Sequence, residues 1–97
     1  MMYGTVAKLR VKPGGLDELQ NWSPDPNGRD RGAVAIYAFQ MDDDPNEVYT
    51  IALFESREAY VANAESPEQD KRYRRMLKSL EGEPEWHDGE VVYHREY

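Results

Sequence analysis

Side chains alternate between two faces along four stretches of the chain, which is the pattern of β-strands. These stretches are residues 3–11, 33–41, 47–55 and 90–97. The first places Lys8 and Arg10 on one face, whereas the second and third are apolar on both faces. Breaker residues at 12–15 and an acidic turn at 42–46 separate the stretches. The sequence therefore predicts four strands, of which the second and third form a hairpin.

Helical spacing occupies the intervals between these strands. Leu16 and Leu19 predict a short helix over residues 16–22. A serine cap predicts a helix from Ser56 to residue 64, and the Ser66-Pro67 start with an apolar stripe predicts another over 66–80. The resulting order is β-α-β-β-α-β, with the second helical segment broken in two. We expect one domain over residues 1–97, an α+β ferredoxin-like fold with a four-stranded antiparallel sheet and helices on one face.

Apolar residues on both faces of the central strands also predict an assembly. Helices on one side leave the other face of the sheet in water. An exposed apolar face of that size exceeds what monomers usually present. We therefore expect a two-fold homodimer, sheet face against sheet face.

Composition excludes several partners. The chain has 12 Lys and Arg against 19 Asp and Glu, a net charge of −7, which argues against binding nucleic acid or an anionic membrane surface. There is no cysteine, and no apolar run is long enough to span a bilayer. No basic region followed by an apolar run opens the sequence, so we expect no signal peptide and a cytoplasmic location.

Several segments together resemble a known family. They are 3–14, Ser56–Tyr60, Ser66–Asp70, Tyr73–Leu77 and Pro84–Val91. These segments are similar to the antibiotic biosynthesis monooxygenase (ABM) domains of the dimeric α+β barrel superfamily. The resemblance implies a homodimer whose two sheets form a barrel, with a pocket between sheet and helices in each subunit.

The resemblance also implies a range of activities. Characterised members oxygenate anthrones or quinols without metal or flavin, some degrade haem, and many have no known activity. The haem-degrading members use an asparagine on the first strand with a tryptophan and a histidine on the helices. This sequence has no asparagine in residues 1–12 and no histidine before His87, which argues against haem degradation. We expect no cofactor, and no metal either, because His87 and His94 match no zinc spacing.

Three residues are candidates for catalysis. Tyr60 and Asn63 are three apart on one predicted helix and share a face, where they could bind a phenolic oxygen. Asn63 stands about where many family members carry a histidine. His87, in the predicted loop before the last strand, is the candidate proton acceptor. The alternatives are that Tyr60 is a core aromatic and that His87 is a turn residue next to the Asp88-Gly89 turn signal.

Three aromatic residues are candidates for substrate binding. Tyr73 could face the same space as Tyr60, or could belong to the core. Trp22, at the end of the first helix, could line the mouth of a pocket or could plug the core. Trp86 precedes His87 in the same predicted loop.

Two functions therefore remain open at this point. One is a cofactor-independent monooxygenase acting on a small aromatic or quinol-type compound bound between sheet and helices. The other is a non-catalytic homodimer that binds a small molecule or has a structural role.

Overall fold

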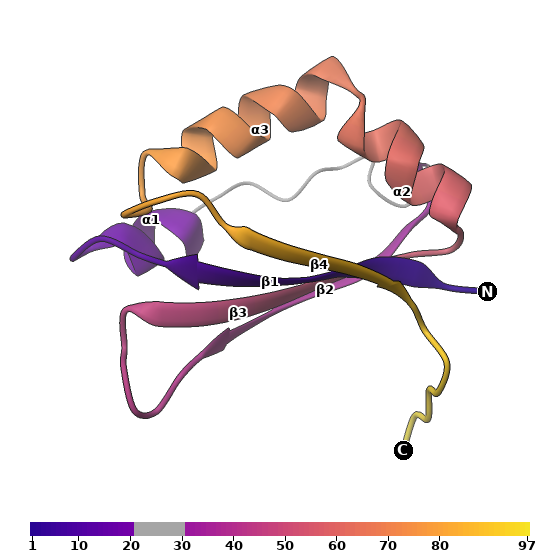
Figure 1. Cartoon of the computed structure of the whole chain (residues 1–97), viewed down its shortest axis with the longest axis horizontal. Coiled ribbons are helices and arrows are strands. Elements are labelled where there is room, and N and C mark those ends of the chain that lie inside the picture. The colour runs from indigo at the N-terminus through magenta and orange to yellow at the C-terminus, as the bar shows by residue number, and fades with distance from the viewer. Residues whose placement is uncertain (21–30) are drawn as a thin grey trace.

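The computed structural model describes residues 1–20 and 31–97. Its strands are β1 (Tyr3–Arg10), β2 (Ala33–Gln40), β3 (Glu47–Phe54) and β4 (Glu85–Glu90), and its helices are α1 (Gly15–Gln20), α2 (Arg57–Ala64) and α3 (Pro67–Leu77). The strands form one antiparallel sheet in the order β2-β3-β1-β4. Helices α2 and α3 lie over one side of this sheet (Figure 1). The predicted α+β ferredoxin-like fold is confirmed.

The register of the sheet decides which side chains share a face. Thr5 of β1 pairs with Ala52 of β3 and with Asp88 of β4. Because side chains alternate along a strand, these residues share one face and the next pair, Val6 and His87, lies on the other. Tyr60 of α2 contacts Asp88. We call the side with Thr5 the helix face and the side with Val6 the open face.

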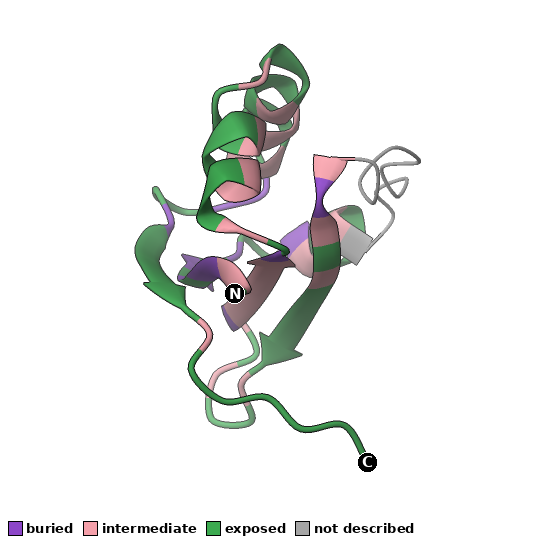
Figure 2. Ribbon diagram, turned by 90° about the vertical axis from the view of Figure 1, so that its right-hand side faces the viewer, coloured by how far each residue is buried: buried purple, intermediate pink, exposed green. Residues whose placement is uncertain are grey.

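The core lies on the helix face, toward one end of the sheet. Its buried side chains come from β1, from β3, and from single residues that follow β1 and α3. Leucines of α1 pack against them. The buried side chains are Ala7, Leu9, Val11, Val48 and Leu80, with Leu16, Leu19, Met76 and Leu77 packed around them. Backbone bonds fasten this end, since Lys12 N–H donates to Ser79 O at 2.9 Å and Glu81 N–H to Arg10 O at 2.8 Å. Figure 2 shows that few residues elsewhere are buried.

Serine caps begin both long helices, as the sequence predicts. The Ser56 hydroxyl accepts from the Ala59 N–H at 3.1 Å at the start of α2. The Ser66 hydroxyl accepts from the Gln69 N–H at 3.2 Å at the start of α3, with Pro67 in the first turn. These caps satisfy N–H groups that have no partner within the helix. None of the described helices has the length and apolar character needed to cross a membrane.

The last strand lies elsewhere than the sequence pattern predicts. The predicted strand was 90–97, but β4 spans Glu85–Glu90 and residues 91–97 have no regular structure. The Val91 N–H still donates to Met2 O at 2.9 Å, and beyond it β1 has no residue left to pair with. Residues 91–97 alternate as a strand would. Strand β1 nevertheless pairs with residues 85–90, so the last strand begins five residues earlier than predicted. We call residues 92–97 the C-terminal tail.

Candidate functional site

Helix α2 carries Tyr60 to the helix face, away from the main core. Its ring centroid lies 5.3 Å from that of Tyr3 and 5.6 Å from that of Phe54, the latter in an edge-on arrangement. The Tyr60 hydroxyl donates a hydrogen bond of 2.8 Å to Asp88 Oδ1 on β4. Because Ser56 starts α2 directly after β3, the helix turns back over the sheet and places Tyr60 one turn in.

The surroundings of Tyr60 keep its phenol protonated. Burial, then the hydrogen bond to Asp88 and the negative charge of that carboxylate, raise the pKa of Tyr60 to about 12. Thr5 is near enough to lower the Tyr60 pKa slightly, but its buried Oγ1 makes no hydrogen bond of good geometry. At neutral pH, Tyr60 is therefore a hydrogen-bond donor, and Thr5 has an unused hydroxyl beside it.

A second aromatic pair follows along the same face. Tyr73 of α3 and Trp86 of β4 have ring centroids 6.1 Å apart and tilted by 45°. Trp86 pairs with Ala7 of β1 and is 44% exposed. Positions 86 and 88 are two residues apart on one strand, which is about 7 Å. The polar pair of Tyr60 and Asp88 is thus flanked by aromatic rings.

We call this group of side chains the aromatic site. It combines flat apolar surfaces with a carboxylate, a protonated phenol and an unused hydroxyl. Its members are Thr5, Tyr60, Tyr73, Trp86 and Asp88. Such a combination suits a small aromatic molecule with a hydroxyl or keto oxygen. No cluster of three or more His, Asp or Glu within 1–20 and 31–97 could hold a metal ion.

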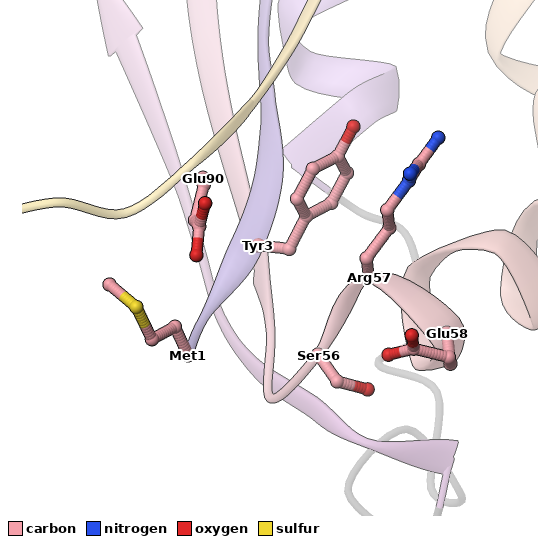
Figure 3. A pocket seen from close by; sticks show the side chains of 6 residues that line it. All are labelled: Met1, Tyr3, Ser56, Arg57, Glu58 and Glu90. Atoms are coloured by element: carbon pink, nitrogen blue, oxygen red, sulfur yellow. The ribbon is translucent and has the colours of Figure 1, made fainter.

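A surface pocket opens next to the aromatic site. It has a volume of about 420 Å³ and is lined by Met1, Tyr3, Ser56, Arg57, Glu58 and Glu90 (Figure 3). Tyr3 belongs both to this pocket and to the packing around Tyr60. The Arg57 guanidinium lies 6.0 Å from the centre of the Tyr3 ring, and the two side chains extend side by side. The pocket therefore adjoins the aromatic site through Tyr3, although no member of the site lines it.

A second cavity, of about 340 Å³, is a poorer candidate. It is lined by Lys8, Leu9, Arg10, Glu47, Glu83 and Glu85. Its cations already have acidic partners, with Lys8 Nζ 3.0 Å from Glu47 and Arg10 Nη1 2.8 Å from Asp44. The first of these bonds raises the pKa of Lys8, and the second lowers the pKa of Asp44. Both cations of this cavity are therefore already paired with carboxylates of the chain.

The structure brings some predicted site residues together and separates others. Tyr60 lies on the helix face, as does the pair of Tyr73 and Trp86. His87 lies on β4 instead of a loop, and its side chain is on the open face with Nε2 3.2 Å from Glu85 Oε1. The geometry therefore does not bring His87 to Tyr60.

Asn63 and Trp22 complete the set of predicted residues. Asn63 is on α2 and half-buried, and its backbone carbonyl accepts from the Ser66 hydroxyl at 2.8 Å. This bond helps to join α2 to α3. Trp22 lies outside the described residues.

Asp88 and Thr5 are the site residues that sequence reasoning missed. Asp88-Gly89 has the pattern of a tight turn, which conceals a carboxylate on a strand. The pairing of β4 with β1 puts Trp86, Asp88 and Glu90 on one face, so a strand assignment for 85–90 would have found Asp88. Thr5 carried no signal of function in the sequence.

The arrangement of the chain is similar to that of known structures. Neither a family model nor a curated protein matches the sequence. SnoaB, a cofactor-independent oxygenase from Streptomyces nogalater, matches with a TM-score of 0.74 at 12% identity, over 96% of this chain and 95% of that one. An antibiotic biosynthesis monooxygenase matches with a TM-score of 0.66 at 15% identity, over 96% and 100% of the two chains.

A protein of unknown function from Nitrosomonas europaea matches equally well. Its TM-score is 0.74 at 16% identity, over 99% of this chain and 94% of that one. At these identities the likeness concerns the fold. The chain has the fold of the antibiotic biosynthesis monooxygenase-type proteins, in agreement with the resemblance found in the sequence.

Proposed function

We propose that this protein is a cofactor-independent monooxygenase that oxidises a small phenolic or quinol-type aromatic compound at the aromatic site. The observation that carries this proposal is the bond from the Tyr60 hydroxyl to Asp88, on a face flanked by aromatic rings. The fold shared with an oxygenase that needs no cofactor supports it. The substrate ring would lie between the flanking aromatic side chains with its oxygen toward Asp88 and Tyr60.

The proton chemistry follows from the charges of the site. The Asp88 side chain, which accepts the hydrogen bond of Tyr60, is the group best placed to accept the substrate proton. Tyr60, whose pKa is raised to about 12, stays protonated and donates to the developing phenolate or enolate oxygen. The Thr5 hydroxyl, which makes no hydrogen bond of good geometry, would be a second donor. In this proposal Asp88 takes the role that the sequence suggested for His87.

The oxygen chemistry then needs only the substrate and O₂. The deprotonated ring is electron-rich and reduces O₂ directly. One oxygen atom becomes a new ring carbonyl, and the other leaves as water with the hydrogens of the ring C–H and the phenolic O–H. The substrate supplies all four electrons, so no external reductant enters the balance. The protein's part is to hold the ring, take the proton and stabilise the anion.

We also infer that two copies pair through their open faces. Tyr37 and Phe39 of β2 lie on this face and are 54% and 50% exposed, and Val6 of β1 is exposed on the same face. Burying several such side chains removes a large apolar area from water. The aromatic sites would then lie on the two outer, helix-covered sides of the dimer, one per chain.

Oxygen consumption tests the proposed activity. The purified protein is offered a panel of anthrones and hydroquinones, without added metal or reductant, in an oxygen electrode. We expect consumption above the protein-free rate, lowered on the order of a hundredfold by Asp88→Asn, because a general base contributes that much. Asp42→Asn removes the same charge from an exposed turn and is the matched control. We expect Tyr60→Phe to lower the rate as well, and Tyr97→Phe to leave it unchanged.

Two results would contradict the oxygenase. One is no consumption with any compound of the panel, which would favour the alternative of a non-catalytic binding or structural homodimer. The other is consumption that Asp88→Asn leaves intact. If His87→Gln alone removed the activity, the reaction would belong to the open face.

A further inference from the structure

Arg57 carries a charge that the described chain does not neutralise. It is exposed at the start of α2, and no carboxylate of the described residues forms an ion pair with it. Its guanidinium lies 6.0 Å from the centre of the Tyr3 ring. In Figure 3 the guanidinium points away from Glu58, the acidic residue next to it in the sequence. The donors of this guanidinium are therefore available to a ligand.

The Tyr3 hydroxyl stands beside this guanidinium. The side chains of Tyr3, from β1, and Arg57, from α2, extend in the same direction along one side of the surface pocket (Figure 3). Tyr3 is half-buried, and its hydroxyl makes no hydrogen bond to another described residue. The two side chains thus present a cation and a neutral donor side by side. A carboxylate accepts from both kinds of donor, and its two oxygens fit the fork of a guanidinium.

The register of β1 and β4 places this pocket next to the aromatic site. On the helix face, Tyr3 pairs with Glu90, and the next pair on that face is Thr5 with Asp88. The two pairs are about 7 Å apart along the strands. The Tyr3 ring also lies 5.3 Å from the ring of Tyr60. An aromatic ring held beside Tyr60 and Asp88 can therefore extend a substituent to the Tyr3 hydroxyl and the guanidinium beside it.

The charges around the pocket favour a ligand group with a single negative charge. Glu58 and Glu90 also line the pocket, and the whole chain has a net charge of −7. A phosphate dianion would be repelled by these carboxylates and would have one guanidinium to offset them, whereas a carboxylate brings one charge. A single unpaired guanidinium in such surroundings discriminates between ligands by the charge of the substituent that reaches it.

We propose that Arg57, together with the Tyr3 hydroxyl, selects aromatic substrates that carry a carboxylate substituent. Arg57 is then a specificity-determining residue, and Asp88 remains the proton acceptor. The inference rests on the aromatic site proposed above as the place where the ring binds, but not on oxygenase activity. Because Arg57 is exposed, added salt should weaken the selection.

Equilibrium binding of two matched ligands tests the selection. Anthraquinone-2-carboxylate and anthraquinone-2-carboxamide share one ring system, differ in the charge of the substituent, and do not react with O₂. Their dissociation constants are measured by NMR titration of the ¹⁵N-labelled full chain. We expect the natural chain to bind the carboxylate about tenfold more tightly, the size of one partly exposed charge-assisted contact. Arg57→Gln should remove this preference and leave the affinity for the carboxamide unchanged, which also shows that the variant is folded.

Three further variants separate charge from geometry. Arg75→Gln removes an exposed cation from α3, is the matched control, and should keep the full preference. Arg57→Lys keeps the charge without the planar fork and should retain part of the preference. Tyr3→Phe removes the neutral donor and should lower the preference by roughly twofold to threefold.

The outcomes distinguish this proposal from the proposed activity. Equal affinity of the natural chain for the two ligands, or a preference that Arg57→Gln leaves intact, would overturn the role of Arg57 while leaving ring binding at the aromatic site. Failure of both ligands to bind would refute the carboxylate selection and the aromatic site together. A preference that depends on Arg57, in a protein that consumes no oxygen with the anthrones and hydroquinones, would support the carboxylate selection and refute the oxygenase.

Discussion

Replacing Tyr60 with phenylalanine isolates one hydroxyl of the aromatic site. The ring that packs against Tyr3 and Phe54 remains, and the bond to Asp88 is lost. A hydrogen bond to a charged group contributes about 1.5–3 kcal/mol to stability in a sheltered place. Because the Asp88 carboxylate is exposed, solvent screening reduces this to about 1 kcal/mol. For a chain of this length, that corresponds to a Tm lowered by roughly 4–8 °C.

A double-mutant cycle measures the interaction itself. The free energy of unfolding is determined in urea for the natural chain, Tyr60→Phe, Asp88→Asn and the double variant, at one protein concentration because association would shift it. We expect a coupling energy of about 1 kcal/mol between the two positions. Asp42→Asn combined with Tyr60→Phe is the control and should be additive, since Asp42 lies in the exposed turn after β2. Additive effects at positions 60 and 88 would refute the hydrogen bond between Tyr60 and Asp88, and with it the orientation of Asp88 as the base.

Three further outcomes follow from the same structure. The pKa of Tyr60 is raised from 10.0 to about 12, so the phenol proton stabilises the fold below pH 10, and this contribution is lost as the pH rises through 12. The free energy of unfolding, measured in urea, should fall less steeply with pH across that range for Tyr60→Phe than for the natural chain. Equal slopes for the two chains would contradict the raised pKa. Gly4→Ala should destabilise the chain by about 3 kcal/mol or more, because a methyl group there would overlap a backbone oxygen of β3. Gly89→Ala is the control and should cost far less, because Gly89 pairs with Gly4 in the sheet but has open space around it. Ser66→Ala should cost about 1 kcal/mol through the lost cap of α3, seen as a lower Tm, and an unchanged Tm would contradict the cap.

The parts of the fold that local patterns determine were predicted well. Alternation located β1, β2 and β3 to within a residue at each end, and serine caps located the starts of α2 and α3. These signals depend on residues close together in the sequence, so they can be read without knowing the partner strands. The same holds for the placement of Tyr60 on a helix.

The last strand shows where local patterns stop being informative. Residues 85–90 are polar and contain Asp88-Gly89, so they do not look like a strand, while 91–97 do. Pairing with β1, more than seventy residues away in the sequence, selects the polar segment. This long-range choice moved His87 to the open face and brought Asp88 to Tyr60. The exchange of one candidate base for the other follows from that five-residue displacement.

Two-dimensional NMR tests directly whether a small aromatic molecule binds on the helix face beside Tyr60 and Asp88. A water-soluble anthraquinone, which belongs to the expected class of products and does not react with O₂, is titrated into ¹⁵N-labelled protein. We expect the largest shift changes on the amides of Tyr60 and Asp88 and on the Trp86 indole. Changes centred on His87 and Tyr37 of the open face, or none at saturating ligand, would contradict it.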